Sequence, residues 1–236
     1  LACCEVGILS SRPEVVVAIV PILFLCEAML LQLRALEGKE KALWVLSAAG
    51  GAITVLGIVS LILGRSSWVR LVFALALLGA FPFHLWLPQV LSGSPFLAAT
   101  VGSVVFSRFG AAVLLEFPVH GKEELLSFAG LVGILWCALA AQAAVDLRQK
   151  IGYWVGLQSS FALFALGEGK FKLGAVFLLA TSPPLLIWSL CASILFDRLK
   201  FLTINKLHGL ATQLPRLNLA LIVGGLGLSV FCLLYT

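Results

Sequence analysis

Residues 98–115 read Ala98-Ala-Thr-Val-Gly-Ser-Val-Val-Phe-Ser-Arg-Phe-Gly-Ala-Ala-Val-Leu-Leu115, an apolar run with a single charged residue, Arg108. A run of this length suits an α-helix that crosses a bilayer and is too long for a strand of a membrane barrel. Hydrophobic residues make up 61% of the 236 residues and charged residues 11%, and the mean hydropathy is +1.10. Because such a chain cannot cover its surface with polar groups, we predict an all-α, polytopic membrane helix bundle.

Polar breaks divide the chain into apolar segments that predict about eight membrane helices within one membrane domain, residues 1–236. The third and sixth segments are short for a full crossing, so we expect one of them to be tilted, broken or only partly inserted. The predicted helices are Glu14–Leu33, Ala42–Gly64, Trp68–Pro82, Pro95–Phe117, Leu125–Val145, Ile151–Gly167, Leu173–Phe196 and Leu217–Tyr235.

Prolines interrupt this pattern at the head of the fourth predicted helix, Pro95, and inside the seventh, Pro183 and Pro184. Proline removes a backbone donor and kinks or breaks a helix. Two interpretations stay open: a kink that serves packing, or a broken helix whose freed backbone groups line a polar cavity. We predict that at least one helix is broken by proline.

Two ionisable residues lie deep within apolar segments. Glu27 sits in Ile22-Leu-Phe-Leu-Cys-Glu-Ala-Met-Leu-Leu31, where its side chain is too short to reach the membrane surface. Burial therefore favours a protonated or paired carboxyl group. Arg108 cannot lose its proton and needs an anionic partner or a water-filled cavity. We predict that Glu27 is this partner.

Five further residues are candidates for a polar axis: His84, Asp146, Arg148, Lys150 and, within the sixth predicted helix, Gln158. His84 follows Pro82-Phe83 near a predicted membrane boundary, where a histidine is either a hydrogen-bonded structural residue or a proton relay. Asp146, Arg148 and Lys150 form a charged break between two predicted helices. This break is either an ordinary loop with a local ion pair or part of the axis.

Several classes of site are not indicated. The net charge of +5 comes from Lys and Arg in short polar breaks, so no basic stripe for nucleic acid is present. The six cysteines show no paired metal-ligand spacing and are expected to behave as small hydrophobic residues. Neither a glycine-rich phosphate loop nor a cysteine cluster is present. We therefore expect no cofactor or metal on this chain.

The stretch Phe81-Pro-Phe-His-Leu-Trp-Leu-Pro88 resembles the Pro-Phe-His-x-Trp-Leu-Pro motif of the antiporter-like membrane subunits of respiratory complex I, most closely subunit 4. Four other motifs, before and after this stretch, occur in the same order along the chain as in the family. These are Phe24-Leu-Cys-Glu27, Asp146-Leu-Arg148, Leu195-Phe-Asp-Arg198 and Gly209-Leu-Ala-Thr-Gln-Leu-Pro215. The resemblance covers most of this chain and roughly the middle of a full-length family member.

The resemblance implies a membrane-arm subunit of a proton-pumping NADH:ubiquinone oxidoreductase. Glu27 and Arg108 would form an ion pair whose making and breaking moves a proton along a hydrated axis. NADH, FMN, iron–sulfur clusters and ubiquinone would belong to partner subunits, with lipids and other complex I membrane subunits as neighbours. We expect the mitochondrial inner membrane, with the bacterial plasma membrane or the thylakoid as alternatives.

The chain departs from the family's pattern at several buried positions. Arg108 stands where the family has a lysine, Leu77 lies near a second expected lysine, and Gln158 and about Thr181 stand for histidines.

Because the family's later helices are not in this sequence, we expect that a second chain supplies them or that this copy has lost them. Two other functions stay open: a component of a multisubunit cation/proton antiporter, or a non-conducting structural remnant of the complex.

Overall fold

The computed structural model describes residues 48–56, 58–59, 67–93, 96–116, 121, 123–199 and 215–233. Within these residues the chain is helical without strands, which confirms the all-α prediction. The predicted helix Glu14–Leu33 lies outside the described residues, so the count of about eight stays a prediction. The helices are α4 (Ser67–Leu78), α5 (Trp86–Gly93), α6 (Phe96–Glu116), α7 (Glu123–Ala143), α8 (Leu147–Gly167), α9 (Phe171–Leu199) and α11 (Pro215–Leu233), with a 3-10 turn, η1 (Phe83–Leu85).

Five of these helices, α6, α7, α8, α9 and α11, begin and end within a few residues of the predicted apolar segments. The largest difference is at α8, which begins at Leu147 instead of Ile151. Asp146 precedes it as the N-cap and accepts a hydrogen bond from the Arg148 N–H, so the helix starts inside the charged break. This extra turn gives the sixth predicted helix a more ordinary length.

The third predicted helix, Trp68–Pro82, is the first half of a longer, broken segment. Helix α4 ends at Leu78, Gly79 has a φ of +63°, and the Phe81–Pro82 peptide bond is cis. The chain then passes through η1 into α5. Taken together, Leu71–Leu91 is long and apolar enough to cross a membrane. The structure thus places a proline at the break between α4 and α5.

Helix α9 passes through Pro183 and Pro184 as one continuous helix. Neither proline can donate to the carbonyl four residues before it, at Leu179 and Ala180. Pro95, the third proline singled out in the sequence, lies outside the described residues. Two further candidate membrane spans are found among the described residues, Glu123–Ala143 in α7 and Lys172–Leu195 in α9.

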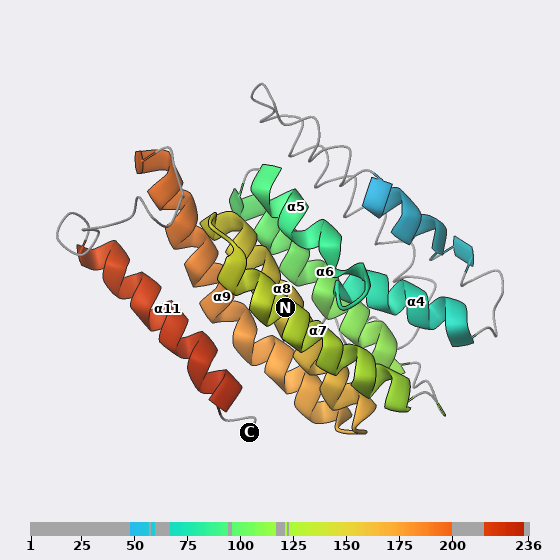
Figure 1. Ribbon diagram of the computed structural model, residues 1–236. Helices are drawn as coiled ribbons and strands as arrows, with labels where there is room; N and C mark the ends of the chain where they lie inside the picture. The colour runs from blue at the N-terminus through green and yellow to red at the C-terminus, as the bar shows by residue number, and fades with distance from the viewer. Residues whose placement is uncertain are drawn as a thin grey trace.

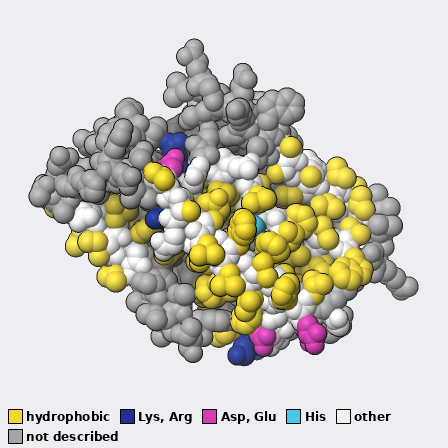
Figure 2. Space-filling model, in the orientation of Figure 1, with side chains coloured by type: hydrophobic (Ala, Val, Ile, Leu, Met, Phe, Trp, Pro, Cys, Tyr) yellow, Lys and Arg dark blue, Asp and Glu magenta, His cyan; other side chains and the backbone are white. Residues whose placement is uncertain are grey.

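The helices run side by side along roughly the same direction (Figure 1). Helix α8 lies in the middle, packed against α7, α9 and α5, and most of its residues are buried. Helix α6 packs between α4 and α9, and α11 packs on α9. Figure 2 shows that hydrophobic side chains dominate the described part of the visible face, as expected for helices in contact with lipid or other membrane helices.

Two glycines set how closely these helices approach. A Cβ at Gly110 in α6 would lie 2.8 Å from the Ala74 carbonyl oxygen and 2.8 Å from Leu78 Cα in α4. A Cβ at Gly130 in α7 would lie 2.6 Å from the Phe164 backbone nitrogen in α8. Membrane helices pack through such small residues because lipid supplies no hydrophobic driving force for their association.

Candidate functional site

Arg108 lies near the middle of α6, more than two turns from either end, and its side chain is half-buried. Its guanidinium group reaches across to α9. There Nε donates to Ser182 Oγ at 3.0 Å, and one terminal nitrogen donates to Ser182 Oγ at 2.5 Å and to the Leu178 carbonyl at 2.6 Å. The other terminal nitrogen donates to Ser107 Oγ at 2.6 Å. These bonds hold the charge against the middle of the candidate span Lys172–Leu195.

All of these acceptors are uncharged. Arg108 is half-buried, and these bonds satisfy its donors without a counter-charge among the described residues. A charge without a counter-charge is costly in a membrane. Glu27, the predicted anionic partner, lies outside the described residues. The structure therefore shows a second set of partners for Arg108, which the sequence did not indicate.

The turn of α9 that receives Arg108 is rich in hydroxyl groups. Ser182 Oγ donates to the Leu178 carbonyl at 2.6 Å, and Thr181 Oγ1 donates to the Phe177 carbonyl at 2.8 Å. Pro183 follows immediately and leaves a carbonyl of this turn without its usual helical donor. A turn of this composition offers oxygen acceptors in the apolar interior, which is what a guanidinium requires.

Gln158 of α8 lies at the same level as this turn. Two ring pairs define the register of α8 on α9: Trp154 with Trp188 at 5.6 Å and Phe161 with Phe177 at 5.7 Å between centroids. Gln158 falls between the two rings on α8, as Thr181 and Ser182 fall between the two rings on α9. It is 4% exposed, and neither its Oε1 nor its Nε2 has a hydrogen-bond partner among the described residues.

We call Arg108, Ser107, Gln158, Thr181 and Ser182 the polar layer. It joins α6, α8 and α9 near the middle of the bundle. Sequence reasoning selected Arg108 and Gln158 as sites and noted Thr181 as a departure from the family's pattern. It missed Ser107 and Ser182, although a hydroxyl residue beside Arg108 and another before the Pro183-Pro184 pair were visible signals.

His84 is buried elsewhere in the bundle, with 3% of its surface exposed. Its ring stacks on Phe81 at 5.8 Å and meets the edge of Trp136 at 6.3 Å. Gly156 of α8 packs nearby, since a Cβ there would lie 3.7 Å from His84 Cβ. Neither ring nitrogen has a partner among the described residues. Both interpretations of this histidine, a structural residue and a proton relay, therefore stay open.

The charged break is at the start of α8. Asp146 Oδ1 accepts from the Arg148 N–H at 3.0 Å, which is N-cap geometry. The Arg148 side chain is buried, with 7% exposed, whereas that of Lys150 is half-buried. The local structure is therefore a capped helix start instead of a loop. A role for these residues in a polar axis stays a prediction.

Replacing Asp146 with alanine is expected to destabilise the first turn of α8 by about 1 kcal/mol, because its N-cap acceptor is lost. Asp146→Asn keeps an acceptor oxygen, so this variant should lose only a few tenths of a kcal/mol of stability. Amide hydrogen exchange at the start of α8 measures both effects. If the two variants exchange like the parent chain but lose proton transfer equally, Asp146 acts through its charge and the capping role is not its main one.

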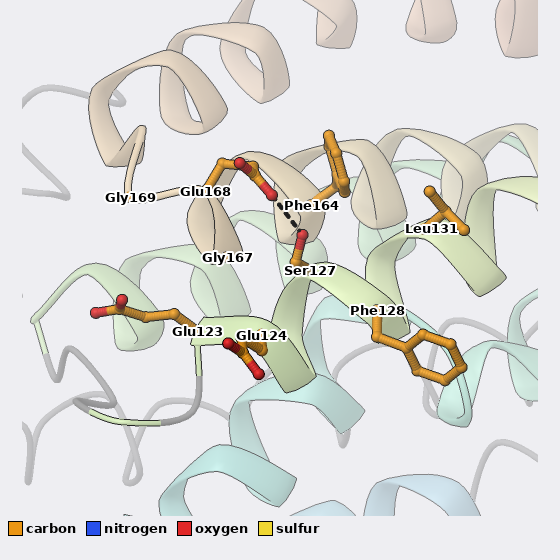
Figure 3. Close-up of a pocket in the computed structure, with 9 residues that line it drawn as sticks. All are labelled: Glu123, Glu124, Ser127, Phe128, Leu131, Phe164, Gly167, Glu168 and Gly169. Atoms are coloured by element: carbon orange, nitrogen blue, oxygen red, sulfur yellow. Dashed lines mark hydrogen bonds between the residues drawn. The ribbon is translucent and has the colours of Figure 1, made fainter.

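An open groove lies between the beginning of α7 and the end of α8 (Figure 3). Glu123, Glu124 and Glu168 are among its lining residues, and Ser127 Oγ donates to Glu168 Oε1 at 2.7 Å. Sequence reasoning did not select this groove, since its acids come from separate helix ends. The described residues hold no group of three His, Cys, Asp or Glu side chains suited to a metal ion.

Comparison with known proteins agrees with the motif order. Residues 42–233 match the family described as NADH:quinone oxidoreductase/Mrp antiporter, TM. The chain is similar to F(420)H(2) dehydrogenase subunit M of Methanosarcina mazei, with 33% identity over 64% of this chain and 32% of that protein. It is also similar to NADH-ubiquinone oxidoreductase chain 4 of Acanthamoeba castellanii, with 25% identity over 66% of this chain and 34% of that protein.

A third similar protein is NADH-quinone oxidoreductase subunit N of Francisella tularensis subsp. holarctica, with 30% identity over 37% of this chain and 20% of that protein. The chain spans about a third or less of the length of these curated relatives. The relatives carry three different subunit designations, M, 4 and N. The similarity therefore applies to the shared membrane region and does not select one of the three subunits.

Proposed function

Because the chain belongs to the family of membrane proteins shared by NADH:quinone oxidoreductases and Mrp antiporters, we propose that it forms part of an antiporter-like subunit of a complex I type assembly. In this proposal it contributes to proton translocation through the membrane arm. The observation that supports the proposal most directly is Arg108, a permanent charge held by side chains and backbone inside a membrane helix bundle. Charges at such positions are costly and mark ion or proton pathways.

The proposed mechanism divides the work between two residues. Glu27 gains and loses a proton, and Arg108 supplies a fixed positive field that favours the ionised carboxylate when the two are close. Moving them apart favours proton uptake by Glu27, and bringing them together releases it. The contacts of Arg108 with α9 support a fixed role, since its donors are already bonded to Ser107, Ser182 and Leu178.

The redox chemistry belongs to other subunits in this proposal, with NADH, FMN, iron–sulfur clusters and ubiquinone bound there. The proposed neighbours are the remaining membrane subunits, lipids and a second chain with further helices of the family. Subunit 4 is our proposed equivalent, supported by the motif order and by the similarity to chain 4 of Acanthamoeba castellanii. We propose the mitochondrial inner membrane, with bacterial and thylakoid membranes as the alternatives.

Substituting Glu27 with glutamine in the parent complex is expected to lower the number of protons moved per electron, because glutamine cannot bind a proton in exchange. Quinone reduction and proton uptake measured together in proteoliposomes give this ratio. Glu124→Gln is the matched control, since Glu124 is exposed at the start of α7. An unchanged ratio in the Glu27 variant would exclude a proton-carrying role for this residue.

A second candidate function is a component of a cation/proton antiporter, because the matched family includes Mrp antiporters. In that case proton flux would be driven by a sodium gradient and would not need quinone reduction. A third is a structural remnant, which is favoured by Leu77 and Gln158 at positions where the family has lysine and histidine. A remnant would keep the complex assembled, and the Glu27 variant would then pump like the parent.

A further inference from the structure

We propose that Ser182 is a positioning residue for Arg108: it occupies the fork formed by Nε–H and a terminal N–H of the guanidinium group, so that a carboxylate can pair with Arg108 through one N–H only. The inference rests on the proposed function, because it concerns the pair that Arg108 and Glu27 form there. It goes beyond that function by assigning to α9 the control of how tightly this pair is held.

Most of the donors of Arg108 are already engaged. A guanidinium group has five N–H donors, one on Nε and two on each terminal nitrogen. Nε donates to Ser182 Oγ at 3.0 Å, and one terminal nitrogen donates to Ser182 Oγ at 2.5 Å and to the Leu178 carbonyl at 2.6 Å. The other terminal nitrogen donates to Ser107 Oγ at 2.6 Å. Four of the five donors are therefore engaged by described residues, which leaves one N–H.

The engaged donors include both forks of the guanidinium group. The Nε–H and the terminal N–H beside it point the same way and match the two oxygens of a carboxylate, so arginine–carboxylate pairs are often bidentate. In this protein both of these donors meet the single oxygen of Ser182. The two terminal nitrogens form the other fork, and one of its donors is bonded to the Leu178 carbonyl. A carboxylate that approaches Arg108 is therefore limited to a single hydrogen bond.

The two serines that accept from Arg108 are themselves held by their own helices. Ser182 Oγ donates to the Leu178 carbonyl at 2.6 Å, and Ser107 Oγ donates to the Val104 carbonyl at 2.9 Å. A hydroxyl group has one hydrogen to donate and two lone pairs to accept with. Because each hydrogen is used within the helix, the lone pairs remain for the guanidinium group, and neither serine has a hydrogen left for a carboxylate.

A single bond suits a pair that has to form and break in every cycle. A hydrogen bond between charged groups is roughly twice as strong as a neutral one, so a second such bond would keep the pair closed for longer. By occupying the fork, Ser182 keeps proton uptake by the carboxylate fast. A lysine would not need this contact, because its ammonium group is a point charge without a fork.

Ser182→Ala opens the fork to a carboxylate, and we expect turnover-linked proton uptake to become about tenfold slower, the effect of one added charge-assisted bond. Uptake is measured on the purified parent complex in liposomes, with a pH dye, after addition of electron donor. Ser182→Thr keeps the hydroxyl group and should restore the parent rate. Ser189→Ala is the matched control and should also keep that rate, because Ser189 lies on α9 and its hydroxyl donates to the Leu186 carbonyl at 2.8 Å.

Arg108→Lys tests the fork itself. In this background there is no fork to open, so adding Ser182→Ala should leave the uptake rate of the lysine variant unchanged. If Ser182→Ala does not assemble, Ser182→Cys takes its place, since a thiol is of similar size and is only a weak acceptor. Equal slowing by the Ser182 substitution in the arginine and lysine backgrounds overturns the inference.

Three further results also overturn it: uptake at the parent rate in the assembled alanine or cysteine variant, equal slowing in Ser182→Ala and Ser189→Ala, and a threonine variant as slow as the alanine variant. Failure of the proposed function appears differently, as an unchanged ratio of protons to electrons in Glu27→Gln. The inference on Ser182 fails alone when Glu27→Gln lowers that ratio and Ser182→Ala takes up protons like the parent.

Discussion

Replacing Gly110 with alanine is expected to destabilise the bundle by about 1–3 kcal/mol, the typical cost of overpacking a close contact. The added Cβ would lie 2.8 Å from the Ala74 carbonyl oxygen and 2.8 Å from Leu78 Cα. These are backbone atoms, so α4 and α6 must separate to make room. Circular dichroism of the chain in detergent during thermal unfolding measures the loss.

The matched control is Gly51→Ala. Gly51 is exposed within a helical segment, and nothing lies within 4 Å of the position of its Cβ. Because alanine favours the helix, this variant should be equal to the parent or more stable by about 0.5–1 kcal/mol. Equal stability of the Gly110 and Gly51 variants would mean that α4 and α6 do not pack through Gly110.

Replacing His84 with leucine is expected to slow turnover-linked proton transfer about hundredfold, in the range found for loss of a general acid–base group. The variant should still assemble, since leucine is apolar and the ring it replaces lies against Phe81 and Trp136. It also removes two ring nitrogens that have no partner among the described residues. Proton uptake by the parent complex, followed with a pH dye after addition of electron donor, measures the rate.

His84→Gln separates titration from polarity. Glutamine keeps hydrogen-bonding groups but does not exchange a proton near neutral pH. If His84 is a relay, both variants lose the same activity. If glutamine restores transfer, the residue serves only as a polar contact, and if leucine transfers protons at the parent rate, the ring is structural.

The helices of this protein could be located from sequence because each is a long apolar run between polar breaks. The ends of α6, α7, α9 and α11 fall within three residues of the predictions. The third segment was harder, because a break at Gly79 to Pro82 leaves two short apolar pieces. An apolar run marks how much chain is buried, but it does not tell whether one helix or two fill that length.

The candidate site could likewise be predicted from the sequence only in part. Arg108 was found from the sequence because a single charge in an apolar run is conspicuous. Its partners on α9, Ser182 and Leu178, lie 74 and 70 residues away. Serine and a backbone carbonyl carry no charge and occur in many membrane helices, so they are weaker signals than a lone charge, although Ser182 stands directly before Pro183 and Pro184. Glu27 is the predicted partner because it lies deep within an apolar segment, whereas the other acids near such segments lie at helix ends.

Hydropathy and the permanent ionisation of arginine are properties of the residues alone, so a helical membrane protein with a charge that it cannot neutralise follows from the sequence. Where that charge is directed depends on how the helices pack. The approach of α6 to α9 brings Arg108 to the hydroxyl-rich turn before Pro183, and the ring pairs bring Gln158 to the same level. Such contacts depend on how helices far apart in the sequence pack, and that is set by the shapes of their surfaces.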